Sequence, residues 1–276
     1  MRDFESEPVS EAPASRPRLP VDGPTTRSLE DFCEERGDYC VRFARDAEDR
    51  RAAQALRYEV FSREMGARVD GAELGLDLDP LDDIADHLLV LERATGTCVG
   101  SYRLLTRDAL GPAANFYTQR IFDLSRLSEE VLEQGVELGR ACVDLRHRTR
   151  GVLQLLLRGI GEYLVRTEKR FLFGCGSVPI KDPGQACLTV QEIEKENWFD
   201  PELRVEAMPS YRPDFSPSST GANPEIPALL YAYCAIGAQL APSPAYDADF
   251  KTLDFFVLLD LERVHPRTYA RYCGTR

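Results

Sequence analysis

A short apolar segment, followed by a basic turn and an amphipathic helix, constrains the fold of this 276-residue chain more than any other feature. Residues 136–143 are mostly apolar over a length typical of a buried strand. Apolar residues then recur at helical spacing across residues 152–164. A strand that leads into a helix is half of a βαβ unit, so the sequence predicts a sheet with at least one parallel pair.

The basic turn lies between this strand and this helix. It contains Arg146, Arg148 and Arg150, with Thr149 as the expected N-cap and Gly151 permitting close backbone approach. The unpaired N–H groups at a helix start, with cations beside them, favour an anion, and phosphate is the usual one. An ordinary solvated turn is the alternative, because short basic loops are common.

Glu137 lies inside the otherwise apolar strand. Ionising a buried carboxylate is costly unless it is paired, so Glu137 is either part of a structural ion pair or a poised base. Arg140 follows three positions later, which places the two side chains on opposite faces of a regular strand. Either a bulge intervenes or the two residues do not act together.

Composition narrows the class of protein. With 43% hydrophobic and 29% charged residues, the chain can bury one core without requiring a second domain. The net charge of -12 argues against a nucleic-acid binder. Residues 140–170 nevertheless carry seven Arg and one Lys against three acidic residues, a local balance of +5. This asymmetry suits a small anionic ligand or an acidic carrier protein.

Cysteine, histidine and proline usage bound the remaining possibilities. The eight cysteines show no C-x-x-C spacing, which indicates free thiols in a reducing compartment, and the three histidines lie far apart, so no metal site is predicted. No signal peptide is recognisable, and we expect a cytoplasmic protein. Five prolines within residues 1–26 predict a disordered tail, which we extend over residues 1–35, leaving one domain at 36–276.

The other segments predict a single α/β or α+β domain with a mixed central sheet flanked by helices. A strand is expected at 39–44, a helix from Asp46 to Gly66, and a hairpin from 87–91 and 97–106. Residues 171–177 should pair in parallel with the first strand, and the two could splay to open a ligand slot. The uncharged residues 226–246 predict a buried or interfacial helix ending near Leu240, and residues 249–261 a last strand.

Three further positions are candidates for a site. Arg57 and Phe61 are four residues apart on the first helix and can line one wall, although a solvated arginine beside a core phenylalanine is commoner. The acidic residues 70–86, including Asp83 and Asp86, either present carboxylates to a cationic substrate or are solvated. Arg103 in the hairpin acquires meaning only with a partner.

Together these segments resemble the ornithine N-acyltransferase family of the GNAT acyltransferase fold. The resemblance covers residues 57–260, and its motifs are 56–61 (LRYEVF), 86–90 (DHLLV), 99–105 (VGSYRLL), 137–143 (ELGRACV), 173–175 (FGC), 227–230 (PALL) and 249–254 (DFKTLD). The chain departs from the family at Asp144 and Leu145, where His-Pro is common. The acyl-homoserine-lactone synthases share the fold and resemble this chain at Arg57, Phe61, Arg103, Glu137 and Arg140.

The resemblance implies transfer of a long 3-hydroxyacyl group from acyl carrier protein to the α-amine of ornithine, towards an ornithine lipid. An ammonium must lose a proton before it attacks a thioester, and Glu137, with Arg140, is the expected catalytic group. Backbone N–H groups near Cys142 and Val143 are expected to hold the oxyanion.

Substrate sites follow from the same resemblance. We expect the acceptor to contact Arg57, Phe61, Arg103, Asp83 and Asp86. The donor is expected at Cys142, Val143, Arg146, Arg148, Arg150 and Gly151. No cofactor should be tightly bound, since the acyl-phosphopantetheine of acyl carrier protein, or acyl-CoA, is a cosubstrate. A lipid product implies peripheral contact with the inner membrane face.

Two other functions remain open. One is an acetyl-CoA-dependent transferase acting on a small amine, because this fold hosts many acceptors, and the length of the acyl slot would discriminate it. The other is a non-catalytic acyl-carrier- or lipid-binding module, in which Glu137 would be dispensable.

Overall fold

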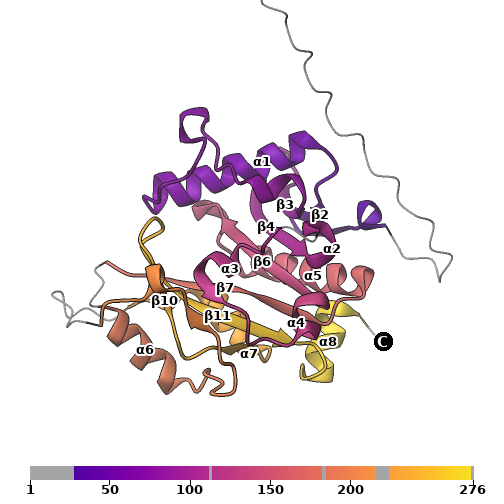
Figure 1. Ribbon diagram of the computed structural model, residues 1–276. Coiled ribbons are helices and arrows are strands. Elements are labelled where there is room, and N and C mark those ends of the chain that lie inside the picture. The colour runs from indigo at the N-terminus through magenta and orange to yellow at the C-terminus, as the bar shows by residue number, and fades with distance from the viewer. Residues whose placement is uncertain (1–27, 112–113, 182–184, 216–223, 275–276) are drawn as a thin grey trace, which may run out of the picture.

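The computed structural model describes residues 28–111, 114–181, 185–215 and 224–274. A nine-stranded mixed sheet runs through the centre in the order β1-β2-β3-β4-β6-β7-β11-β10, with β9 also pairing with β11 (Figure 1). Its strands are β1 (Cys33–Arg36), β2 (Tyr39–Phe43), β3 (Asp86–Glu92), β4 (Cys98–Thr106), β6 (Gly135–Val143), β7 (Phe171–Pro179), β9 (Gln239–Leu240), β10 (Ala245–Asp247) and β11 (Thr252–Asp260). A small second sheet pairs β5 (Phe122–Asp123) with β8 (Glu206–Ala207).

Helices cover both faces of the sheet. The α-helices are α1 (Ala47–Arg57), α2 (Arg107–Leu110), α3 (Thr118–Ile121), α4 (Glu129–Glu133), α5 (Arg150–Thr167), α6 (Gln185–Lys195), α7 (Ala228–Ala235) and α8 (Pro266–Cys273). A π-helical turn, η2 (Tyr58–Glu64), continues α1. The 3₁₀ turns are η1 (Leu29–Asp31), η3 (Ala72–Leu74), η4 (Pro80–Asp83), η5 (Leu145–His147) and η6 (Pro209–Tyr211).

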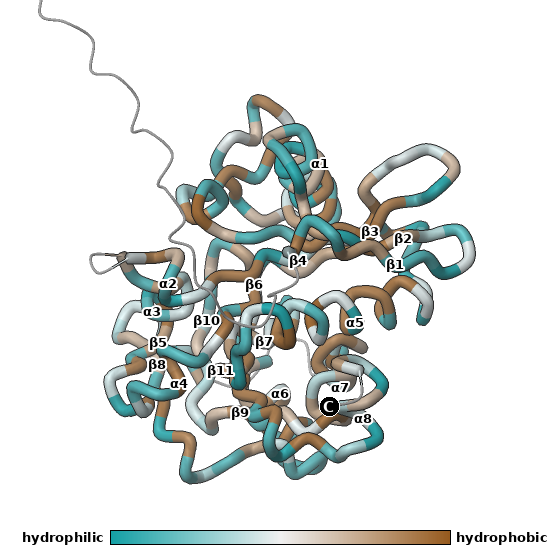
Figure 2. The backbone as a smooth tube through the Cα atoms, turned by 90° about the vertical axis from the view of Figure 1, so that its right-hand side faces the viewer, coloured by the Kyte–Doolittle hydropathy of each residue, from teal (hydrophilic) through white to brown (hydrophobic). Residues whose placement is uncertain are grey.

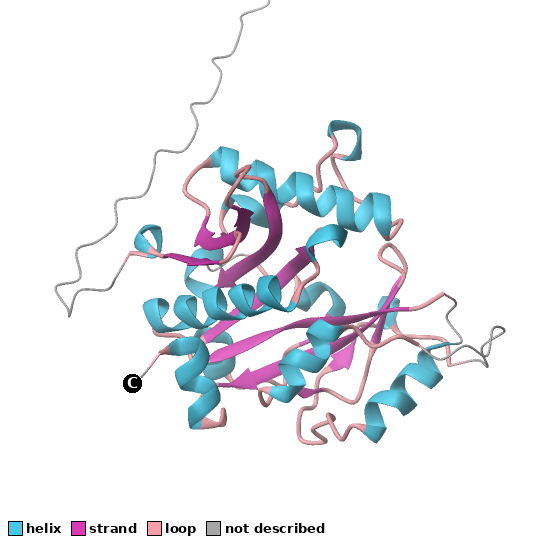
Figure 3. Ribbon diagram, turned by 180° about the vertical axis from the view of Figure 1, so that it is seen from behind, coloured by secondary structure: helices cyan, strands magenta, loops and turns pink. Residues whose placement is uncertain are grey.

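The two faces carry different layers (Figure 2). One face packs on α5, whose Val152, Leu156 and Ile160 join the largest hydrophobic cluster, and Figure 3 shows this helix lying across the strands. The opposite face packs on α1 and η2, and further along on the segment around α3, β5 and β8. We call this second face the α1 face.

Local sequence explains where the main helices begin. The Asp46 carboxylate accepts hydrogen bonds from the N–H groups of Glu48 and Asp49 at the start of α1, and the Thr149 hydroxyl accepts one from Val152 at the start of α5. Both predicted starts are confirmed. The predicted β3–β4 hairpin, the β11 strand and the free state of all eight cysteines are confirmed as well.

β6 and β7 form a fork. They pair in parallel, as predicted, but only from Gly135↔Phe171 to Leu138↔Gly174. Beyond these four pairs β7 continues beside β11, whereas β6 continues beside β4. The predicted splaying of the two strands is therefore present.

Two expectations need correction. The prediction of a helix that ends near Leu240 is wrong, because α7 already ends at Ala235. Gly237, with a φ of 108°, then turns the chain into β9. Residues 29–36, mostly assigned to the tail, form η1 and β1 instead, while residues 1–27 lie outside the described residues. Within the described part of the chain, no helix combines the length and apolar character needed to cross a membrane.

Candidate active site at the strand fork

A β-bulge in β6 lies beside the fork. The register passes from Arg103↔Gly139 to Ser101↔Cys142, so β6 has one more residue than β4 over this stretch. Arg140 absorbs the extra residue at a φ of 52°, a conformation that only a minority of non-glycine residues adopt. The bulge returns the Arg140 side chain to the α1 face, where Glu137 lies opposite Leu105. A bulge therefore places Glu137 and Arg140 on the same face of the sheet, despite their spacing of three residues.

The backbone of β6 has an open edge here. Residues 139, 142 and 143 pair with β4, and none of residues 139–143 has a ladder partner in β7 among the described residues. Cys142 and Val143 belong to this edge, where a backbone N–H that points away from β4 would be available to an oxyanion. The Cys142 side chain itself packs against Leu56 and Phe61, and burial raises the pKa of its thiol. Cys142 is therefore suited to contribute backbone rather than a thiolate.

Glu137 anchors the start of α3. Its Oε1 accepts the Thr118 N–H at 2.6 Å and its Oε2 accepts the Tyr117 N–H at 3.1 Å, and the residue is only 2% exposed. Burial raises the pKa of Glu137, although the hydrogen bonds from Thr118 and the charge of Arg103 act in the opposite direction. Glu137 therefore stabilises the start of α3, and its pKa is raised above that of an exposed glutamate.

Next to Glu137 lies a buried cluster of three arginines and three aspartates, here called the arginine–aspartate cluster. Arg57 contacts Asp82 at 2.5 Å (Nη2 to Oδ2) and 2.9 Å (Nη1 to Oδ1), and Asp77 at 2.8 Å (Nε to Oδ2). Asp79 Oδ2 lies 3.0 Å from Arg103 Nη1 and 2.9 Å from Arg140 Nη2. Burial alone would raise the pKa of Asp79, but the charges of Arg103 and Arg140 lower it below its ordinary range. The six charges cancel, which offsets much of the desolvation that each would suffer alone.

This cluster changes the assignment of the acidic loop. The carboxylates at the arginines are Asp77, Asp79 and Asp82, whereas Asp83 is exposed and lies 3.5 Å from Arg50. Asp86 accepts a hydrogen bond from the Tyr163 hydroxyl of α5 at 2.8 Å. Asp83 and Asp86 are therefore not brought to the predicted acceptor residues.

Of the three arginines, Arg140 has the most accessible side chain. Arg57 is 0% exposed and committed to two aspartates, while the Arg140 side chain is 13% exposed. The Arg140 guanidinium lies 5.2 Å from the ring centroids of both Tyr117 and Phe250. Phe61 packs edge-on against Phe250 at 5.6 Å, so one aromatic ring separates it from the Arg140 guanidinium.

The three arginines of the basic turn differ in their contacts. Arg146 pairs with Asp144 at 3.1 Å, and Arg148 binds both carboxylate oxygens of Glu64 at 2.6 and 2.7 Å. Arg148 also donates to the Val143 carbonyl at 3.1 Å, which fixes the turn to the open edge of β6. Arg150 is exposed at the first turn of α5, next to Gly151, and no ion pair holds it within the described residues.

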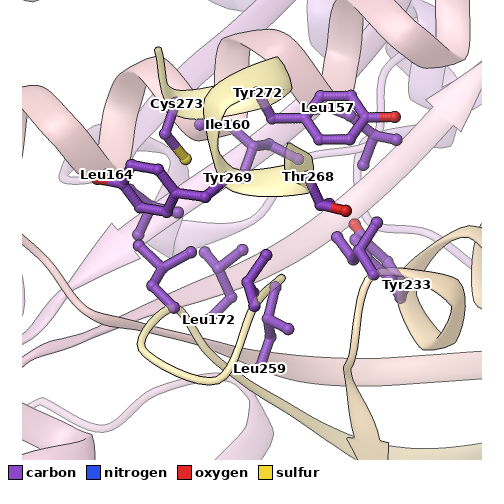
Figure 4. A pocket seen from close by; sticks show the side chains of 14 residues that line it. Leu157, Ile160, Leu164, Leu172, Tyr233, Leu259, Thr268, Tyr269, Tyr272 and Cys273 are labelled. Atoms are coloured by element: carbon purple, nitrogen blue, oxygen red, sulfur yellow. The ribbon is translucent and has the colours of Figure 1, made fainter. Parts of the chain in front are cut away.

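An apolar pocket lies on the other face of the sheet (Figure 4). It is lined by Leu157, Ile160 and Leu164 of α5, Leu172, Leu259, Tyr233 and residues of α8. The Tyr233 hydroxyl is hydrogen-bonded to the hydroxyl of Tyr102, which lies in β4 between Ser101 and Arg103, opposite the bulge. This hydrogen bond thus joins the pocket to β4, the strand that pairs with the bulged part of β6.

Comparison with known proteins places these features in a family. A family model described as "Acetyltransferase (GNAT) domain" matches residues 56–158. The chain is 34% identical over 249 residues to an L-ornithine N(alpha)-acyltransferase of Rhizobium meliloti (strain 1021), with 85% of this chain and 83% of that protein covered. A protein of the same name from Brucella abortus (strain 2308) is 32% identical over 86% of this chain and 89% of its own. Among solved structures, the AHL synthase LasI aligns at 14% identity with a TM-score of 0.47, covering 86% of this chain and 95% of that chain.

Proposed function

Because the chain belongs to the L-ornithine N(alpha)-acyltransferase family of GNAT-fold N-acyltransferases, we propose that it transfers a long 3-hydroxyacyl group from acyl carrier protein to the α-amine of L-ornithine. The observation that carries the proposal is the similarity to these relatives over about 85% of the chain, because it spans the fork, the bulge and the arginine–aspartate cluster.

The proposed reaction has a simple balance. The α-ammonium first gives up a proton, and the free amine then attacks the thioester carbonyl to form a tetrahedral oxyanion. Collapse of this species forms the amide and expels the thiolate, which takes up a proton to leave as the thiol. The open edge of β6 beside Cys142 and Val143 offers N–H groups to the oxyanion.

We assign the first proton transfer to Glu137. Its carboxylate lies on the α1 face with Arg140, and burial raises its pKa in the direction that a base near neutrality requires. Each oxygen accepts one backbone N–H, which leaves a further lone pair on each. Arg140, whose charge lies between Asp79 and the Tyr117 ring, is proposed to face the α-carboxylate of the acceptor.

Two observations support a long acyl donor on a carrier protein. Apolar side chains line the pocket of Figure 4, which suits an apolar acyl chain, and its Tyr233 is hydrogen-bonded to Tyr102 of β4. The exposed Arg150 at the start of α5 suits the phosphate of a phosphopantetheine arm and an acidic carrier surface.

Reactions with purified protein test this function. The protein is incubated with L-ornithine and, in separate reactions, 3-hydroxyacyl carrier protein, the matching acyl-CoA and acetyl-CoA, and products are identified by mass spectrometry. We expect Nα-(3-hydroxyacyl)ornithine, formed fastest from the carrier protein. Acetylornithine as the main product would instead identify an acetyl-CoA-dependent transferase.

A further inference from the structure

One buried carboxylate on the α1 face lacks the counter-charges that the arginine–aspartate cluster supplies. Asp254 of β11 is 3% exposed and lies opposite Ser177 of β7 and Ala245 of β10. Its Oδ1 is buried without a hydrogen-bond partner, and no arginine or lysine pairs with it in the described residues. A buried acceptor left in this state costs free energy, so a ligand that satisfies it would be bound favourably.

Other polar side chains lie near Asp254. Asp247 of β10 is 6% exposed and adds a second carboxylate, one oxygen of which accepts the N–H groups of Asp249 and Phe250. The hydroxyls of Ser177 and Thr252 are hydrogen-bonded to Asp254 and lower its pKa, against the larger effect of burial. Two carboxylates with these hydroxyls beside them match a primary ammonium, which has three N–H donors and a positive charge.

The position of this group relative to the fork also fits the acceptor. The Tyr117 ring contacts Arg140 at 5.2 Å, and the pKa of its phenol is raised by burial and further by the charges of Asp247 and Asp254. Tyr117 thus lies near Arg140 of the bulge and within electrostatic reach of the two aspartates. Ser177, the neighbour of Asp254 on β7, is exposed, so the carboxylate lies just below the surface. The two nitrogens of extended ornithine are about 6 Å apart, from bond lengths near 1.5 Å, which suits a ligand passing Tyr117.

We propose that Asp254, with Asp247 beside it, binds the distal ammonium of the acceptor and so selects a diamino acid over a neutral one. The inference rests on the proposed function and assigns the substrate specificity of that same site. It replaces Asp83 and Asp86 in this role. Asp254 is a specificity residue rather than the base, because β7 separates β11 from the bulge in β6.

Two acceptors that differ by one amine test the proposal. L-norvaline is L-ornithine without the distal nitrogen, and kcat/KM is measured for both with wild type, Asp254→Asn and, as the matched control, Asp83→Asn. We expect Asp254→Asn to lower kcat/KM for ornithine at least about tenfold, the scale of a charge-assisted hydrogen bond, and to leave norvaline nearly unchanged. The Asp83→Asn enzyme should retain the wild-type ratio.

Equal loss for both acceptors, or an unchanged ratio, would overturn the assignment. Asp247→Asn is the second variant, and it replaces Asp254→Asn if that protein does not fold. We expect it to lower the ratio of kcat/KM for ornithine to kcat/KM for norvaline by a smaller factor. Calorimetric titration of both amino acids separates this inference from the proposed function. If wild type fails to acylate ornithine, the proposed function falls, but tighter binding of ornithine than norvaline, lost in Asp254→Asn, would still support the site. Equal binding of both to wild type would reject it.

Discussion

At the scale of single residues, Glu137 shows how one side chain can serve the fold and the chemistry together. Its two oxygens fix the N–H groups of Tyr117 and Thr118, and Tyr117 in turn lies against Arg140. Any substitution at Glu137 therefore alters the wall of the site as well as the proposed base, and the two effects must be measured separately.

We expect Glu137→Gln to lower kcat about 100-fold or more, the scale of a general base. An amide has only one oxygen, so one of the two backbone N–H groups loses its acceptor and stability should fall by about 1–3 kcal/mol. Steady-state kinetics and urea unfolding on the same preparation check both values. A variant that is destabilised as expected but turns over normally would leave Glu137 with the structural role alone.

The burial of Asp254 predicts how the free energy of unfolding depends on pH, whether or not a substrate is bound. Burial raises the pKa of Asp254 to about 6, and the nearby Asp247 adds to the rise. The folded state therefore binds this proton more tightly than the unfolded chain, whose aspartate has a pKa of about 3.9. Below about pH 4 both states are protonated and ionisation costs nothing. Above pH 6 the ionised group destabilises the fold by about 3 kcal/mol, from about two pKa units at 1.36 kcal/mol each.

Removing this charge should stabilise the protein. We expect Asp254→Asn to raise the free energy of unfolding at pH 7 by up to about 3 kcal/mol, and the gain should disappear as the pH falls towards 4. Urea unfolding at pH 4, 5.5 and 7 measures the difference, with Asp83→Asn as the control that should show no comparable trend. A variant less stable than wild type at pH 7 would mean that Asp254 already has a partner in the free protein.

At the scale of secondary-structure elements, much of the fold could be predicted from the sequence. The hairpin of β3 and β4 and the strand β11 were recognisable as mostly apolar segments of strand length, buried at nearly every position, and the helix α5 by apolar residues at helical spacing. α7 was misjudged because an uncharged segment can be helix or buried strand, and only the turn at Gly237 decides between them.

The candidate site was less predictable for a different reason. The sequence identified Arg57, Arg103 and Arg140, but the partners of these arginines depend on contacts between segments that are distant in the chain. The carboxylates that pair with the arginines include Asp77 and Asp79, whereas the sequence suggests Asp83 and Asp86. No local pattern shows which carboxylates of a loop turn inward. Asp254 was overlooked because a single aspartate in an apolar strand gives no periodic signal.

A prediction about binding of the acyl donor concerns the first turn of α5. Arg150 has no ion pair in the described part of the chain, so Arg150→Ala should raise the KM for the acyl carrier protein and flatten its salt dependence, with the KM for ornithine nearly unchanged. Arg263→Ala, an exposed arginine after β11, is the control. Arg148 is unsuitable for this test because its loss would also free Glu64. Unchanged donor saturation would move the docking surface elsewhere.

At the scale of the whole molecule, the sheet separates two chemical environments. The buried arginines and aspartates gather on the α1 face, while the apolar pocket lies on the face that carries α5 and α8. A substrate with a polar head and a long apolar chain, as proposed for this protein, would use both environments.

Filling the pocket should change the acyl chain that is used. Thr268 of α8 lines the pocket and is only partly buried, so Thr268→Trp should reduce turnover of long acyl donors relative to short ones without disturbing the core. Arg267→Trp places the same side chain on the same helix outside the pocket lining and serves as the control. Competition between donors of two chain lengths, resolved by mass spectrometry, gives the ratio. An unchanged ratio would show that the chain lies elsewhere.

The fork has a mechanical consequence as well. Only four residue pairs of β6 and β7 join the two halves of the sheet, and they are bounded by Gly135 and Gly174, where an added Cβ would lie 2.2 Å from Val131 O and 2.3 Å from Leu138 O. Each half keeps its own ladders, so we expect this seam to act as a hinge between the two halves of the sheet. Amide hydrogen exchange would then be faster at residues 135–138 than in the paired centre of β4, and equal protection of both would describe a rigid sheet.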